Sequence, residues 1–201
     1  MTKTNLPMWV VYMLAIGAMA PVAAEPYARV DTTMGEFIVE LYPSDAPETV
    51  ANFMQYTNGG HYDRTLIHRV VHGYVVQGGG YSIYFNERPV RDPVSYEGDN
   101  GRKNIRGTLA MARGKSQDSA QAQWYINLSD NEDLDHKVID DLPLYGYTVF
   151  GAVISGMDVV DAIGAVPTGP GGPFESEAPV EKVVINSVDI IDDALELSGA
   201  D

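Results

Sequence analysis

The stretch HRVVHGYVVQGGG, residues 68–80, sets an arginine and a glutamine among valines and aromatic residues. Side chains alternate between two faces of a β-strand, so Arg69, Val75 and Gln77 are expected on one face, with Gly73 allowing a bend between them. A guanidinium is always charged and offers forked donors, and an amide can orient it by hydrogen bonding. The spacing equally allows a surface or salt-bridged Arg69 and an edge position for Gln77.

A second stretch, AQAQWYINL, repeats this mixture of polar and apolar residues. Alternation predicts one face with Trp124, Ile126 and Leu128, which is typical of a protein core. The opposite face carries Gln123 and Tyr125, which we expect to lie either in solvent or in a cleft.

The remaining chemistry-bearing residues give no second candidate site. His68 and His72 lie on an expected strand broken by Gly73, and their spacing fits no common zinc-ligand pattern. The segment GGGYS lacks both the strand-to-helix context and the lysine of a phosphate-binding loop. We therefore expect no metal ion and no cofactor.

The elements that position these residues are mostly β-strands. The run GEFIVELY (35–42) alternates apolar and acidic residues and follows YARVDTTMG, so the two predict a hairpin. Further strands are expected at 107–112, 123–128, 147–154 and 181–191. The Gly- and Pro-rich segment 167–179 is expected to be a surface loop.

Two helices are expected between these strands. The segment SDAPETVANFMQYTNGG has Ser44 or Asp45 as a possible N-cap, Pro47 in the first turn and two glycines at its end. Its buried stripe is predicted to be Val50, Phe53 and Met54. The second helix, near 156–166, should bury Met157, Val160 and Ile163. Many short strands with two separated helices favour a closed antiparallel barrel over a parallel α/β sheet.

Composition limits the classes of protein and partner. The 201 residues favour one domain, and the absence of cysteine excludes disulfides, thiolate metal sites and cysteine nucleophiles. The formal net charge of −15 does not favour binding to nucleic acid or to anionic lipid.

The first 24 residues differ from the rest and are typical of a secretory signal. Lys3 precedes an uncharged apolar run, Met8–Ala20, and small residues lead to a cleavage site after Ala24. The alternative is an uncleaved anchor, but the run of 13 residues is short against the roughly 20 that span a bilayer. We expect a mature periplasmic or otherwise exported domain, 25–201, with a core of about 28–191, an acidic tail at 192–201 and no stable membrane association.

Three segments carry a resemblance to a known family: residues 68–80, 107–136 and 146–163. In these stretches the chain resembles the cyclophilin-type peptidyl-prolyl cis–trans isomerases, most closely the exported bacterial branch. The resemblance covers about 28–191. It implies an eight-stranded antiparallel β-barrel capped by two α-helices, catalysis of rotation about X–Pro bonds in exported proteins, and proline-containing polypeptides as partners of a monomer. A proline-peptide-binding module or holdase with weak catalysis is the alternative.

The resemblance also implies a set of site residues. The catalytic arginine of the family corresponds to Arg69, assisted by Gln77. The substrate-binding positions are Tyr74, Val75, Ala112, Arg113, Gly114, Gln123, Tyr125, Leu134 and Tyr147.

Three departures from the family pattern involve four residues. Tyr74 and Val75 replace a Phe-Met pair, so a hydroxyl that can point to solvent stands at the pocket. Tyr125 replaces a phenylalanine and adds a hydroxyl that needs a partner if it is buried. Asp133 stands where many members have an aromatic residue, so we expect weak binding of cyclosporin.

Overall fold

The fold is a closed antiparallel β-barrel, seen in a computed structural model that describes residues 25–191. The strand order around the barrel is β1-β12-β3-β4-β6-β5-β9-β2. In chain order these strands are β1 (Tyr27–Thr32), β2 (Gly35–Leu41), β3 (Thr65–Val71), β4 (Val75–Ser82), β5 (Thr108–Met111), β6 (Trp124–Asn127), β9 (Val149–Ser155) and β12 (Val183–Ile191). The predicted eight-stranded barrel with two helices is confirmed. The expected signal segment and acidic tail lie outside the described residues.

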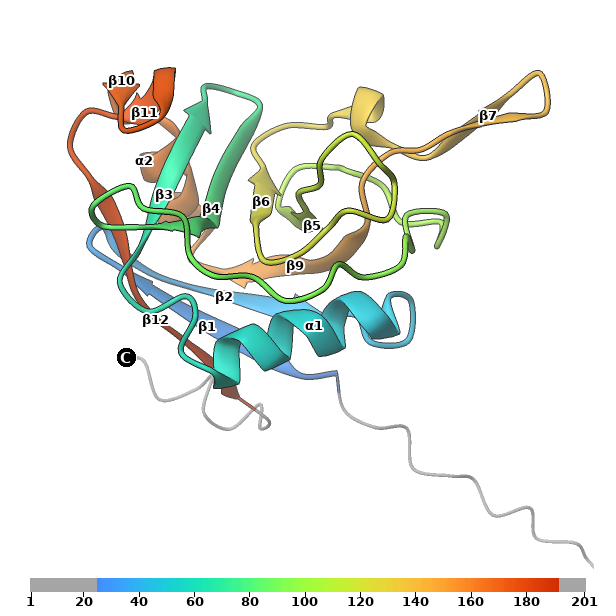
Figure 1. Ribbon diagram of the computed structural model, residues 1–201, viewed down its shortest axis with the longest axis horizontal. Helices are drawn as coiled ribbons and strands as arrows, with labels where there is room; N and C mark the ends of the chain where they lie inside the picture. The colour runs from blue at the N-terminus through green and yellow to red at the C-terminus, as the bar shows by residue number, and fades with distance from the viewer. Residues whose placement is uncertain (1–24, 192–201) are drawn as a thin grey trace, which may run out of the picture.

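The core fills the barrel and extends under the longer helix, α1 (Pro47–Asn58), which covers one side of the barrel in Figure 1. Phe53 of α1 lies 5.3 Å from the ring of Tyr62 and 5.4 Å from that of Phe150, centroid to centroid. Each such side chain contributes about 1.5–3 kcal/mol when it is fully buried. Val50 and Phe53 are buried as predicted, whereas Met54 is only partly buried.

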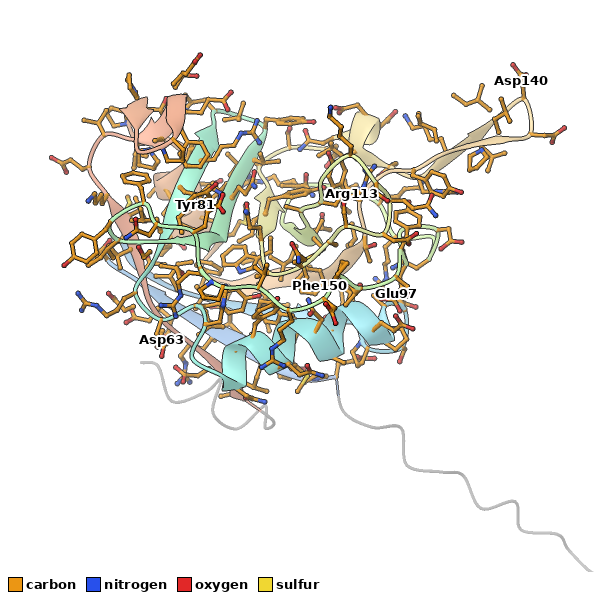
Figure 2. All side chains as sticks on the ribbon, in the orientation of Figure 1. Asp63, Tyr81, Glu97, Arg113, Asp140 and Phe150 are labelled. Carbon is orange, nitrogen blue, oxygen red and sulfur yellow. The ribbon has the colours of Figure 1, made fainter. Side chains whose placement is uncertain are left out.

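The beginning of α1 differs from the prediction. The N-cap position is Ala46, without a side-chain cap, so the proposed capping by Ser44 or Asp45 is wrong. Instead, Glu97 accepts hydrogen bonds from the backbone amides of Glu48 (3.0 Å) and Thr49 (2.8 Å). Figure 2 shows Glu97 beside this end of the helix. A distant carboxylate therefore satisfies the free amides and complements the helix dipole.

Several short elements lie outside the barrel. They are α2 (Met157–Gly164), the 3₁₀ turn η1 (Glu132–Leu134), and the two-stranded sheets β7 (Lys137–Ile139) with β8 (Leu142–Leu144) and β10 (Thr168–Gly171) with β11 (Phe174–Pro179). Helix α2 buries Val160 and Ile163, and Met157 is partly buried. Within residues 25–191, every helix is too short or too polar to cross a bilayer.

The expected loop at 167–179 is wrong, because this segment forms the β10–β11 hairpin. Phe174 in β11 stacks on His68 at 5.3 Å and meets Tyr81 edge-on at 5.1 Å, centroid to centroid. This aromatic contact holds the hairpin against the barrel, and Figure 1 shows β10 and β11 beside the end of β3. Packing against the barrel thus overrides the loop-like composition of the segment.

Candidate functional site

Arg69 and Gln77 face each other on neighbouring strands. They are direct partners in the β3–β4 register, which confirms that they share one face. The Arg69 Nη1 donates to Gln77 Oε1 at 3.2 Å, and Gln77 Nε2 donates in turn to Gln123 Oε1 at 2.9 Å. The three side chains form a continuous polar row across β3, β4 and the segment before β6.

The glycine run at the end of β4 makes room for this row. A Cβ built on Gly80 would lie 2.6 Å from side-chain atoms of Gln123. Because real contacts of this kind are never so short, any larger residue at this position would displace the amide of Gln123. Gly80 therefore makes room for the side chain of Gln123, whereas Gly78 and Gly79 lie against other neighbours, such as Ile67 and Tyr62.

Glu177 is a member of the site that the sequence did not reveal. The Arg69 Nε donates to Glu177 Oε2 at 2.8 Å, and the two side chains remain 34% and 42% exposed. Glu177 lies on β11 with a φ of +65°, a left-handed conformation that is uncommon outside glycine. Arg69 is therefore both salt-bridged, which its spacing in the sequence had left open, and part of the polar row. The sequence separation of 108 residues left no local signal.

A cavity of about 290 Å³, with both polar and apolar walls, adjoins Arg69. It is lined by Arg69, Tyr74, Val75, Gln77, Ala112, Arg113, Tyr125, Leu134 and Tyr147. Tyr125 and Tyr147 meet edge-to-face, with centroids 5.6 Å apart. A concave apolar site with a few convergent polar groups is typical of ligand binding.

A second cavity of about 250 Å³ continues the first. The two share Gln77, Ala112 and Arg113, and the second adds Gly114 and Gln123. The structure therefore brings all the predicted site residues together along one groove made of two adjoining pockets.

The hydroxyl of Tyr125 has the buried partner that the sequence required. It donates to Asn104 Oδ1 at 2.8 Å, and Asn104 Nδ2 donates to the carbonyl oxygen of Leu134 at 3.0 Å. Burial raises the pKa of the Tyr125 hydroxyl well above its usual range, so it stays protonated and donates. Asn104, which sequence reasoning missed, thereby links two walls of the pocket beside Arg69.

The hydroxyl of Tyr74 points to the rim of the pocket instead of into free solvent. It donates to Asp133 Oδ2 at 2.7 Å. Desolvation, followed by the hydrogen bond and negative charge of Asp133, raises the pKa of Tyr74 to about 12. Two of the departures from the family pattern therefore act as a pair.

Comparison with known proteins decides the family. Residues 27–190 match the model of the cyclophilin-type peptidyl-prolyl cis–trans isomerases. The chain belongs to the cyclophilin family. It is 40% identical over 185 residues to peptidyl-prolyl cis-trans isomerase A of Dickeya dadantii, covering 90% of this chain and 95% of that protein. It is 42% identical over 159 residues to peptidyl-prolyl cis-trans isomerase B of Escherichia coli, covering 79% and 96% respectively.

Solved structures agree on the architecture. A Cryptosporidium parvum cyclophilin matches with a TM-score of 0.67 at 23% identity, covering 85% of this chain and 99% of that one. At this identity the match supports the fold alone. The family and the bacterial relatives together make this cyclophilin a peptidyl-prolyl cis–trans isomerase.

In this cyclophilin Arg113 fastens one side of the groove. Its Nε donates to the carbonyl oxygen of Gly146 at 2.9 Å and its Nη2 to that of Tyr145 at 2.6 Å. Its guanidinium lies 4.8 Å from the ring centroid of Tyr147. Figure 2 shows Arg113 on the side of the barrel nearer the β7–β8 hairpin. The side chain therefore holds segment 145–147 against the pocket.

The histidines of the cyclophilin serve packing. His68 is 1% exposed, and burial lowers its pKa to about 4, so it is neutral at pH 7. His61 Nε2 lies 3.0 Å from the carbonyl oxygen of Gly79, and His72 Nδ1 lies 2.8 Å from that of Gly164. In the part of the chain that the structure describes, no group of three or more potential metal ligands lies close together.

Proposed function

We propose that this cyclophilin isomerises X–Pro bonds in exported proteins as a folding catalyst, with Arg69 as its catalytic group. The observation that supports this most directly is the guanidinium in the wall of a pocket that also has tyrosine and aliphatic side chains, with Nε and Nη1 already engaged by Glu177 and Gln77. Within residues 25–191, Nη2 donates to no protein acceptor and is directed by the other two bonds.

The chemistry of the reaction suits such a group. Resonance gives the peptide C–N bond a rotation barrier of about 18–20 kcal/mol. Rotation breaks no covalent bond, so a donor that stabilises the twisted imide nitrogen is sufficient to accelerate it. A guanidinium can serve the nitrogen and the carbonyl with separate N–H groups.

The other groove residues have four roles in this proposal. Gln77 orients Arg69, and Gln123 pairs with the substrate backbone. The proline ring is seated by Tyr74, Val75, Tyr125 and Leu134, while Ala112, Arg113, Gly114 and Tyr147 line the groove. Seating the ring fixes one side of the bond, and Arg69 acts on the other.

Arg69→Ala tests the assignment, with Arg102→Ala as a matched control. Arg102 pairs with Asp45 and belongs to neither pocket. Loss of a charged transition-state donor should lower kcat/KM for a proline tetrapeptide by about 2–4 kcal/mol, or roughly 30- to 1000-fold, with an unchanged far-UV spectrum. Near-normal activity in folded Arg69→Ala protein would refute the catalytic role.

Export is supported by the signal-like composition of residues 1–24. Intact-mass measurement on protein from the native host should give a monomer that begins at or near Glu25. Ala24→Trp should slow cleavage, because that position of a cleavage site takes small residues. A full-length, membrane-bound species in the unmodified strain would overturn this part of the proposal.

A further inference from the structure

The β7–β8 hairpin stands away from the barrel. Its pairs are Lys137 with Leu144, Val138 with Pro143 and Ile139 with Leu142. Asp140 and Asp141 form the turn, with φ of +50° and +63°. Figure 1 shows the hairpin projecting beyond the body of the protein, and Figure 2 shows Asp140 at its tip.

This hairpin carries apolar side chains that the fold does not use. Its register places Ile139, Leu142 and Leu144 on one face, with exposures of 55%, 71% and 53%. Val138 on the opposite face is 64% exposed. A two-stranded hairpin alone is marginally stable, and side chains left in water add little to its stability. Clustered exposed apolar groups of this kind mark interaction surfaces.

The apolar face is continuous with the substrate groove. Leu144 is followed directly by Tyr145 and Gly146, whose carbonyl oxygens accept the hydrogen bonds of the groove residue Arg113. The next residue, Tyr147, lines the pocket beside Arg69, and its amide donates to the carbonyl oxygen of Leu134 at 2.9 Å. The hairpin therefore rises directly from one wall of the site.

The distance between the hairpin and the pocket suits a substrate that passes through the groove. Leu142 lies five positions before Tyr147 in the chain, so their Cα atoms are at most about 18 Å apart. An extended polypeptide spans the same length with about five or six residues. A segment that close to the bound proline can therefore contact the hairpin without leaving the groove.

Charge and backbone chemistry disfavour a second copy of this chain as the occupant. Pairing two hairpins would bring four tip carboxylates together in a protein of net charge −15. Pro143 on β8 lacks an amide hydrogen, which interrupts any further strand pairing along that edge. An unfolded chain that contributes apolar side chains meets neither obstacle.

We propose that Ile139, Leu142 and Leu144 form a second binding site for an apolar segment of the same polypeptide whose proline occupies the groove. The proposal rests on the proposed function and refines its substrate class. The enzyme would prefer prolines with aliphatic or aromatic residues about five positions away. Such a tethered contact raises the effective concentration of the proline at the groove, so it lowers KM and leaves kcat unchanged.

The test compares two variants with three substrates. The hairpin variant is Ile139→Thr, Leu142→Thr and Leu144→Thr, which keeps β-propensity. The control variant is Ile105→Thr, Ile154→Thr and Val180→Thr, which alters three apolar residues of similar exposure, 51%, 47% and 66%, outside the hairpin. The substrates are a proline tetrapeptide, a 15-residue peptide with leucines about five positions before or after its proline, and the same peptide with serines instead.

The hairpin variant should raise KM about five- to tenfold for the leucine peptide and leave both other substrates unchanged. The control variant should behave as wild type on all of them. Equal losses on every substrate, or no loss on any, would overturn the proposal. A wild-type protein that sediments as a dimer, together with a hairpin variant that sediments as a monomer, would also overturn the proposal, because the apolar face would then bind a second copy.

Failure of the proposed function looks different. In that case the wild-type enzyme would already be inactive on the tetrapeptide, whatever the state of the hairpin. The single variant Leu142→Glu provides a second arm should the triple variant fold poorly. It changes only the most exposed of the three residues and should likewise weaken the leucine peptide alone.

Discussion

Glu177→Ala tests whether the distant carboxylate positions the catalytic arginine. The Arg69 Nε–Glu177 Oε2 distance is 2.8 Å, but both side chains are over a third exposed. Exposed ion pairs of this kind contribute only about 0–1 kcal/mol, so the fold should lose no more than that. In the proposed mechanism catalysis depends on the direction of the Arg69 Nη2, and Gln77 alone would leave the guanidinium free to rotate about the Nη1 hydrogen bond.

The expected loss in kcat/KM is about five- to tenfold, or ~1–1.4 kcal/mol, and it should fall on kcat. Glu177→Gln keeps an acceptor for the Arg69 Nε and should lose only about two- to threefold. A protease-free isomerisation assay on a proline tetrapeptide measures both, and urea unfolding measures stability in parallel. Rescue by the amide would separate positioning from simple loss of the hairpin contact.

A double-mutant cycle gives the decisive control. If Glu177 acts only through Arg69, then Glu177→Ala should not lower the residual activity of Arg69→Ala any further. The same factor in both backgrounds would show that Glu177 supports the groove independently of the arginine. A faster Glu177→Ala enzyme would refute the reasoning in the opposite sense, because the carboxylate would then be weakening the positive charge that catalysis needs.

Three further predictions concern the pocket and the core. Asp133→Trp should tighten cyclosporin binding by about 2–4 kcal/mol relative to the wild type. Cyclosporin should inhibit the wild type only weakly, because an ionised carboxylate beside an apolar macrocycle loses hydration, and nanomolar inhibition of the wild type would contradict this. Burial lowers the pKa of His68 to about 4, below its unfolded value near 6.5. The free energy of unfolding should therefore be greatest above pH 6.5 and drop by up to about 3 kcal/mol as the pH falls to 4. In urea titrations, His68→Phe should flatten that drop. Asn104→Ala should lower the free energy of unfolding by about 2–3 kcal/mol, because it leaves the buried Tyr125 hydroxyl without its acceptor. Adding Tyr125→Phe should recover part of this loss, and strictly additive losses would contradict the pairing.

Local sequence patterns were enough for the barrel and for part of the groove, whereas Ala112, Arg113, Gly114, Leu134 and Tyr147 were assigned only through the family resemblance. Alternation in β2 and β6 located strands, and the pair Arg69–Gln77 followed from spacing in β3 and β4. Assigning these residues to an isomerase site still needed the family resemblance, because spacing alone allowed a surface arginine.

What sequence reasoning missed depends on contacts between distant residues. Glu97 caps α1 from 49 positions away, and Glu177 reaches Arg69 across 108. Neither carboxylate differs in type or setting from the many other acidic residues of the chain. The β10–β11 hairpin was mistaken for a loop because Gly and Pro dominate it, whereas the stacking of Phe174 on His68 decides its structure.

The closed barrel also sets how the site exchanges with solvent. Arg69, Gln77 and Tyr125 lie on strands that are bonded to neighbours on both sides. Their amide hydrogens should therefore exchange for deuterium slowly, because exchange requires opening of the barrel ladders. The β7–β8 hairpin shares no ladder with the barrel, so its amides should exchange through brief local openings. Deuterium exchange should thus separate the strand residues of the groove from the hairpin that extends from its wall.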